Sequence, residues 1–249
     1  MEVINLNDLK SLNLNILPYG SPGCGKTRFL GTVGEVLYTL AVDVDNGFKT
    51  MKMLPRAMTD NIVTVRMTSF KDIDAIYQLV LKNDPERWAK ALGIPVKKPF
   101  EAVGFDTWSE VSWEIIKEKR VLLKKAGDGL GFRENIQIQD WGAITDLNHM
   151  AIEAFTDAPI TFICTMHEQM YTDDKAGITM GVPSINGKFA PEVGKYFDVQ
   201  GHMYVDLMGK YTMDTIARAK FQGKSRLKLD KSIVDPTFKK LWDAIADQR

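Results

Sequence analysis

Eight consecutive residues near the start of the chain carry the strongest chemical signal in the sequence. They match G-x-x-x-x-G-K-[ST], the pattern of loops that wrap around nucleotide phosphates. Glycines let the backbone approach phosphate oxygens closely, and the helix that follows adds the positive end of its dipole. The lysine supplies a point charge to the β- and γ-phosphates, and the threonine hydroxyl is placed to ligate Mg²⁺. The predicted ATP-binding residues are Gly20, Ser21, Pro22, Gly23, Cys24, Gly25, Lys26, Thr27 and Arg28, with Lys26 also catalytic.

A loop of this kind needs a second magnesium ligand at the end of a neighbouring strand. Asp106 follows the apolar run 102–105, where a carboxylate can hold a metal-bound water and orient the ion. The same aspartate can also cap the next helix, and the two roles are compatible. Because Thr107 follows, the Asp-Glu pair of many helicases and AAA+ machines is missing. We therefore assign Thr27 and Asp106 to Mg²⁺ and look for a catalytic base elsewhere.

Two other predicted strand ends carry polar residues suited to the reaction. Asp45 is the candidate general base, with Asp43 behind it, because alternate acids on a strand point to opposite faces. A turn rich in Asp, Asn and Gly explains the same residues without catalysis. His167 follows the run 160–165 and can contact the γ-phosphate or the attacking water without carrying a charge. Gln169 is the reserve candidate, and a purely structural histidine is the alternative.

The elements that position these residues are short apolar runs alternating with helix-like stretches. This alternation predicts βαβ units and a mainly parallel sheet flanked by helices. Ser69 is a plausible cap for one helix, and we expect Trp108 and Trp113 to pack in the core. The predicted strands are residues 14–17, 38–44, 62–66, 102–105 and 160–165, and the predicted helices are 28–37, 69–82, 109–125 and 140–155.

The second half of the chain has a different character. Three glycines punctuate residues 171–188, which indicates a long loop or a ragged hairpin. Residues 199–207 and 210–217 predict an antiparallel hairpin, and residues 236–246 a closing helix. Residues 84–99, with three prolines and several lysines, predict a surface insertion.

Composition limits the classes of protein and of partner that fit this chain. The chain has 249 residues, 45% of them apolar, which fits one large α/β domain and excludes wholesale disorder. Two cysteines indicate reduced thiols rather than a disulfide scaffold. No signal peptide and no membrane-spanning run is evident, so we expect no membrane partner and a cytoplasmic protein. With a net charge of zero, any nucleic-acid contact has to come from a local basic patch.

The chain resembles the RecA-like P-loop ATPases of phages in the order of four features: the phosphate loop and the DVDNG, FDTWSE and TMHEQ strand ends. These ATPases include nucleotide-binding or AAA proteins and the Sak-type single-strand annealing proteins. The resemblance covers about residues 14–229. It implies a single RecA-like domain over 1–249, with a core of about 13–229 and a terminal helix of about 236–246.

The resemblance also implies roles for individual residues. The general base of RecA-like cores maps to Asp45, where RecA itself has Glu, and the sensor maps to His167, where RecA has Gln. Residues 171–188 correspond to the loop that grips single-stranded DNA, and residues 124–135 to the other DNA-facing loop.

The basic stretch 218–228 resembles the region that sends a cationic finger into a neighbouring subunit's nucleotide. Lys220, Lys224 and Arg226 are the favoured catalytic cations, and a solvated charged turn is the alternative. A finger delivered between subunits requires a homo-oligomer with nucleotide at its interfaces.

The expected function is therefore an ATPase that binds single-stranded DNA and promotes annealing or recombination in a phage, in the host cytoplasm. A single-strand binding protein is a further candidate partner. Two alternatives stay open: a replication accessory ATPase such as a helicase loader, and a small-molecule P-loop kinase.

Overall fold

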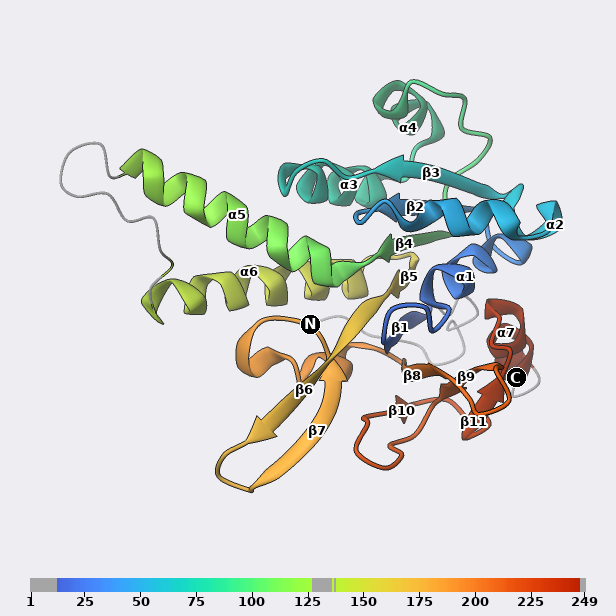
Figure 1. Cartoon of the computed structure of the whole chain (residues 1–249). Helices are drawn as coiled ribbons and strands as arrows, with labels where there is room; N and C mark the ends of the chain where they lie inside the picture. The colour runs from blue at the N-terminus through green and yellow to red at the C-terminus, as the bar shows by residue number, and fades with distance from the viewer. Residues whose placement is uncertain (1–12, 127–135, 137, 247–249) are drawn as a thin grey trace, which may run out of the picture.

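The computed structural model describes residues 13–126, 136 and 138–246. These residues fold around one twisted sheet with the strand order β11-β9-β8-β1-β5-β4-β2-β3 (Figure 1). In addition, β10 pairs with β8, and β6 pairs with β1 and β7. The strands are β1 (Asn15–Gly20), β2 (Thr39–Asp43), β3 (Ile62–Arg66), β4 (Ala102–Asp106), β5 (Thr161–Cys164), β6 (Met166–Asp173), β7 (Ile178–Pro183), β8 (Val199–Val205), β9 (Tyr211–Asp214), β10 (Lys224–Ser225) and β11 (Ser232–Val234).

The centre of this sheet is parallel. The pairs β2–β3, β2–β4, β4–β5, β1–β5 and β1–β8 all run in the same direction, whereas β9, β10 and β11 join antiparallel. The fold class predicted from the sequence is thus confirmed, including the antiparallel β8–β9 hairpin. Because parallel strands end at the same edge, the residues after β1, β2 and β4 are brought together there.

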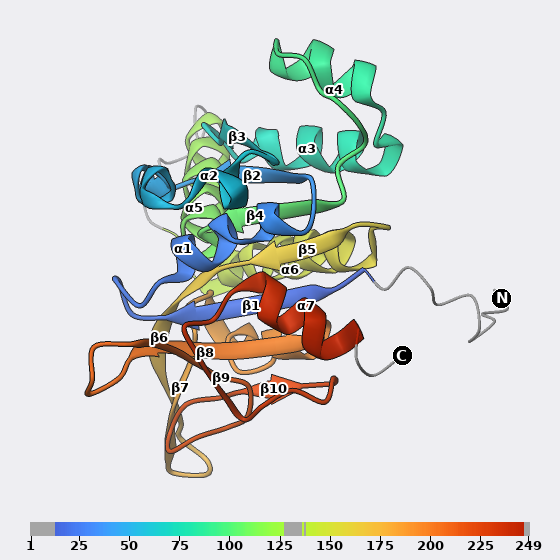
Figure 2. The same ribbon diagram turned by 90° about the vertical axis from the view of Figure 1, so that its right-hand side faces the viewer.

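Helices cover both faces of the sheet (Figure 2). The long helices α3, α5 and α6 enclose one apolar core with the sheet, and α1 and α7 enclose a second core on the opposite face. The helices are α1 (Lys26–Gly31), α2 (Arg56–Thr59), α3 (Lys71–Lys82), α4 (Pro85–Leu92), α5 (Trp108–Ala126), α6 (Ile138–Asp157) and α7 (Phe238–Ala246), with 3₁₀ turns η2 (Val33–Glu35), η3 (Gly47–Met53), η4 (Gly187–Phe189) and η5 (Val193–Tyr196).

Two local predictions are wrong. Trp113 is 51% exposed, because on α5 it faces away from the stripe that buries Trp108 and Val111. Ser69 does not cap α3 with its side chain; Phe70 occupies the cap position. Instead, the Asp72 carboxylate in the first turn accepts a hydrogen bond from the Ser69 backbone N–H at 3.0 Å.

The segment 171–188 is mostly a regular hairpin rather than an irregular loop. Strand β6 pairs with the end of β1 at Tyr19 and Gly20, then continues beyond the sheet paired with β7. The hairpin projects from the body of the molecule (Figure 1). Its base therefore lies beside the phosphate loop, and its tip lies away from it.

The predicted surface insertion, residues 84–99, contains the helix α4 at the periphery of the molecule (Figure 2). Asp84 caps this helix by accepting from the Arg87 N–H at 2.8 Å. Trp88 is fully buried and packs edge-on against Phe100, which anchors the segment to the core. None of the described helices combines the length and apolarity needed to cross a membrane.

Candidate nucleotide site

The loop between β1 and α1 has the backbone that phosphate binding requires. Gly25 has φ of 97°, a left-handed conformation that residues with a Cβ rarely adopt. A Cβ at Gly25 would also lie 3.0 Å from the Tyr211 ring. At Gly20, a Cβ would lie 2.1 Å from the Met203 carbonyl oxygen, so β1 and β8 approach too closely for a side chain. Both glycines are therefore fixed by geometry.

Lys26 is folded onto its own loop. Its ammonium donates to the carbonyl oxygens of Gly20 at 2.8 Å and Ser21 at 2.9 Å, and the residue is buried. The charge thus lies at the centre of the loop, where a polyphosphate would be held. The Cys24 side chain is also buried, and burial raises the pKa of its thiol, which fits the role of a neutral spacer.

Thr27 and Asp106 lie side by side as predicted. The Thr27 hydroxyl donates to Asp106 Oδ2 at 2.5 Å, and the Thr165 hydroxyl donates to Asp106 Oδ1 at 2.5 Å. Asp106 is only 2% exposed, and this burial raises the pKa of its carboxyl, while the two hydroxyl hydrogen bonds oppose the rise. A cation would stabilise the ionised form of this buried group.

These oxygens suit Mg²⁺, which prefers oxygen ligands and usually keeps several waters and phosphate oxygens. No group of three or more His, Cys, Asp or Glu residues arranged for a metal occurs in the described part of the chain. A site of one carboxylate and one hydroxyl, completed by substrate phosphates, is consistent with that observation.

The two candidate bases, Asp43 and Asp45, have different surroundings in the structure. Asp43 Oδ1 accepts from the Gly47 N–H at 3.0 Å, so its carboxylate shapes the turn after β2. Asp45 lines the cavity over the phosphate loop, and its charge is one of the influences that raise the pKa of Asp106. Asp45 therefore has the better position for a base, and its assignment as the base stays a prediction.

His167 reaches the same cavity from the start of β6. Its backbone N–H donates to Ser109 Oγ at 3.0 Å, and its buried Nδ1 has no hydrogen-bond partner among the described residues. Burial, and then the nearby Lys26 charge, lower the pKa of His167, so the ring is neutral at pH 7. Gln169 instead donates to the Ile185 carbonyl at 3.0 Å and braces the turn after the β6–β7 hairpin.

Lys26, Thr27, Asp45, Asp106 and His167 line one cavity of about 270 Å³. A contact at this cavity was not predicted from the sequence: the Arg28 guanidinium lies 5.4 Å from the centre of the Tyr211 ring. The cavity is lined by Pro22, Gly23, Gly25, Lys26, Thr27, Arg28, Asp45, Thr50, Asp106, Thr107, His167 and Tyr211.

A family model described as an AAA domain matches residues 12–227 of the sequence. The chain belongs to the AAA-domain family. It is accordingly a P-loop ATPase domain of AAA type, in agreement with the geometry of the loop. None of the curated proteins matches the sequence.

Two solved structures show a distant likeness to this AAA domain. One is an ATPase from the type III secretion system of pathogenic bacteria, with 15% identity, a TM-score of 0.44 and coverage of 79% of this chain. The other is the flagellar accessory protein FlaH from Methanocaldococcus jannaschii, with 9% identity, a TM-score of 0.43 and coverage of 89% of this chain and 84% of that one. The chain spans 54% of the length of the secretion ATPase.

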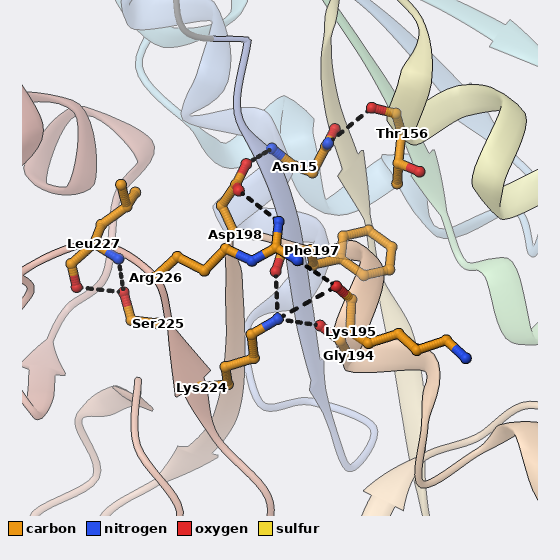
Figure 3. A network of polar contacts seen from close by, with 10 residues as sticks. All are labelled: Asn15, Thr156, Gly194, Lys195, Phe197, Asp198, Lys224, Ser225, Arg226 and Leu227. Atoms are coloured by element: carbon orange, nitrogen blue, oxygen red, sulfur yellow. Dashed lines mark hydrogen bonds and ion pairs between the residues drawn. The ribbon is translucent and has the colours of Figure 1, made fainter. Parts of the chain in front are cut away.

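None of the three predicted finger cations lines the cavity of this AAA domain. Two of them, Lys224 and Arg226, belong to a network of polar contacts (Figure 3). The Lys224 ammonium donates to the carbonyls of Gly194 at 2.9 Å, Phe197 at 3.0 Å and Lys195 at 3.4 Å. Arg226 donates to Lys195 O at 2.6 Å and pairs with Asp198 at 3.3 Å. Asp198 in turn accepts from the Asn15 N–H at 2.9 Å, so the network ties η5 and β10 to the start of β1.

Lys220 differs from these two cations. It is exposed, and its ammonium lies 5.7 Å from the centre of the Phe221 ring. Of the two predicted DNA-facing loops, residues 171–188 form the β6–β7 hairpin, and residues 127–135 of the other lie outside the described residues. The finger and DNA-contact assignments stay predictions.

Proposed function

We propose that this AAA domain binds Mg²⁺·ATP in the cavity over its phosphate loop and hydrolyses it. One observation carries the proposal: a lysine and a threonine at the start of α1, two aspartates and a histidine from other segments of the chain surround a single cavity. Their types match the needs of phosphoryl transfer, which depends mainly on positioning and electrostatic stabilisation.

The hydrogen bonds that Lys26 makes within the phosphate loop suggest how ATP binds. Lys26 leaves the Gly20 and Ser21 carbonyls and donates to the β- and γ-phosphates instead. Thr27 and Asp106 would hold Mg²⁺, which neutralises charge on the phosphate oxygens when bound. Thr165, which already donates to Asp106, keeps that carboxylate oriented.

Hydrolysis follows from the placement of Asp45 and His167. The attacking water forms a bond to the γ-phosphorus and passes its proton to Asp45, while the bond to the β,γ-bridging oxygen breaks and ADP leaves. Neutral His167 can donate a hydrogen bond to the γ-phosphate or orient the water. Its unpartnered buried Nδ1 supports this role, because such an atom normally has a partner.

Tyr211 and Arg28 line the part of the cavity that we assign to the nucleoside. An aromatic ring held against the first turn of α1 offers a flat apolar face at the rim of the phosphate site. We assign this face to the base or ribose of the nucleotide.

The finer part of the proposal is that a homo-oligomer of this chain binds single-stranded DNA and promotes annealing or recombination in a phage. The resemblance in sequence supports it, and so does the hairpin. His167, the candidate sensor, is the second residue of β6, and the β6–β7 hairpin projects as an arm with exposed Met170 and Ile178. Contact between bound ATP and His167 would order the hairpin arm for DNA binding, and ATP hydrolysis would release the DNA.

The test combines two assays on the native chain, Lys26→Ala and Asp45→Asn. We expect ATP turnover stimulated by single-stranded DNA, lost in both variants, with ATP binding lost only in Lys26→Ala. DNA should bind more tightly with a non-hydrolysable ATP analogue. Equal DNA affinity with and without the analogue would defeat the coupling, and phosphorylation of a nucleoside without DNA stimulation would favour a kinase.

A further inference from the structure

The 3₁₀ turn η3 lines two cavities. Its residue Thr50 lines the nucleotide cavity, whereas Phe48, Lys49 and Lys52 line a second cavity of about 360 Å³, which we call the η3 groove. The other walls of the groove come from the turn after β2, from the end of α2 and from β3, the strand that ends the sheet order opposite β11 (Figures 1 and 2). A volume of this size lies within the range of about 300–1,000 Å³ that is typical of ligand sites.

Exposed cations surround the η3 groove. Lys49 and Lys52 line it, and exposed Arg56 begins α2, whose last residue also lines it. Arg66 follows the lining residue Thr64 by two positions on β3, so its exposed side chain points to the same face of the sheet. Among the described residues, none of these four cations forms an ion pair.

The local charge balance is strongly positive. Residues 46–67 contain four Lys or Arg against one acid, Asp60, in a chain whose net charge is zero. Asp43 also lines the groove, but it is only 9% exposed and its carboxylate accepts from the Gly47 N–H. Asp45 lines the nucleotide cavity instead. Unpaired cations gathered along one groove attract a polyanion.

Phe48 adds an aromatic surface to these charges. Its ring is half-buried, packs against the apolar core on the α1 face of the sheet and lines the groove. Sites for single-stranded nucleic acid combine cations that follow the phosphates with an aromatic ring on which a base stacks. A duplex keeps its bases stacked on one another, so a hollow of this kind selects a single strand.

We propose that the η3 groove binds single-stranded nucleic acid, with its four cations on the phosphates and one base against Phe48. This surface differs from the two loops, 171–188 and 124–135, that the sequence predicted to face DNA. The inference names the DNA-binding surface of the proposed function and rests on that function. Because η3 also lines the nucleotide cavity through Thr50 and directly follows the turn that carries Asp45, a strand in the groove contacts the same segment as ATP.

Fluorescence anisotropy with a labelled oligothymidylate, over a range of salt concentrations, tests the cations. Lys52→Ala and Arg66→Ala should each weaken binding about 3-fold and lower the slope of log K against log [salt] by about 0.7, as expected for one lost phosphate contact. Replacing all four cations should weaken binding about 100-fold. Lys82→Ala is the matched control, because Lys82 is exposed at the end of α3 on the opposite face of the sheet. Native-like binding by the fourfold variant would overturn the groove.

Phe48→Leu tests the stacked base, because leucine keeps the apolar packing but has no flat ring. The change should weaken oligothymidylate binding about 5-fold and leave the binding of an abasic strand of equal length unchanged. The native chain should bind the single strand more tightly than a duplex. Equal losses for both strands, or equal affinity for the duplex, would overturn the single-strand assignment. Polyglutamate that binds as tightly as the oligonucleotide would show a general polyanion surface and would overturn it as well.

Calorimetry with Mg²⁺·ATP separates this inference from the proposed function. Lys52→Ala and Arg66→Ala should bind ATP like the native chain, because neither residue lines the nucleotide cavity. If all variants bind both ATP and single-stranded DNA like the native chain, the groove is wrong and the proposed function stands. If the native chain binds ATP but no nucleic acid, the groove and the DNA-binding role both fail, and the nucleotide site stands.

Discussion

Replacing Lys224 with alanine distinguishes a structural brace from a catalytic finger. In the folded chain the Lys224 ammonium joins three carbonyls around η5, those of Gly194, Lys195 and Phe197. Truncation leaves these acceptors without the charged donor, and β10 loses its attachment to η5. If the contacts seen here are the main role of Lys224, the loss appears as stability before it appears as activity.

The magnitude follows from the hydrogen bonds. A bond to a charged group contributes about 1.5–3 kcal/mol, but Lys224 is only half-buried and water can replace part of the set. We expect a loss of about 2 kcal/mol in the free energy of unfolding. In a domain of this size that corresponds to a fall of roughly 4–8 °C in Tm.

Thermal and urea unfolding of native, Lys224→Ala and Lys220→Ala chains provide the measurement. Lys220 is exposed, so its removal should change stability by less than about 0.5 kcal/mol. An unchanged Tm for Lys224→Ala would refute the brace. If that chain also lost ATPase activity and regained it in mixtures with Lys26→Ala, Lys224 would act between subunits.

Three further predictions concern the nucleotide site. Thr165→Val removes the hydroxyl that donates to Asp106 Oδ1, so the pKa of Asp106 should rise further. The Mg²⁺ concentration for half-maximal ATPase activity should rise about 5-fold, which corresponds to roughly 1 kcal/mol for the lost hydrogen bond. An unchanged Mg²⁺ dependence would count against this role of Thr165. Tyr211→Ala should weaken ATP binding about 10-fold while inorganic triphosphate binds as before, because we assign the ring to the base or ribose and not to the phosphates. Fluorescence titration measures both affinities, and equal losses would contradict the assignment. In NMR titrations His167 should have a pKa below 6.5, and Lys26→Met should raise this pKa, because removing a nearby positive charge favours the imidazolium. An unchanged or lower pKa in Lys26→Met would contradict the influence of the Lys26 charge.

Local sequence was sufficient where chemistry depends on neighbours in the chain. The phosphate loop is a contiguous motif whose glycines and lysine act within eight residues, so its position and flanking elements were predicted. The parallel sheet also followed from buried apolar runs, and Asp106 from its place at the end of one of them. Asp45 was preferred over Asp43, and the structure adds the reason, since Asp43 is occupied by the turn that contains Gly47.

Contacts between distant segments were not predictable in this way. Thr165 and Tyr211 reach the site through sheet pairing and through the β8–β9 hairpin, and the sequence assigned neither of them a role in the site. A Thr ending the predicted strand beside Asp106 was the available signal for Thr165. The composition of the basic stretch 218–228 predicts one charged surface, but its residues have different roles in the structure. Lys224 and Arg226 donate to backbone carbonyls, whereas Lys220 is exposed. Trp113 was misplaced because hydrophobicity alone does not say on which side of α5 a residue lies.

Isothermal titration calorimetry with ATP and Mg²⁺ tests the central claim most directly, using the native chain beside Gly25→Ala. At Gly25 a methyl group would be strained by the left-handed backbone conformation and would lie 3.0 Å from the Tyr211 ring, which would have to shift. We predict saturable binding of one ATP per native chain and no binding by a folded Gly25→Ala chain. Absence of binding by the native chain, or equal binding by both proteins, would contradict the nucleotide site described above.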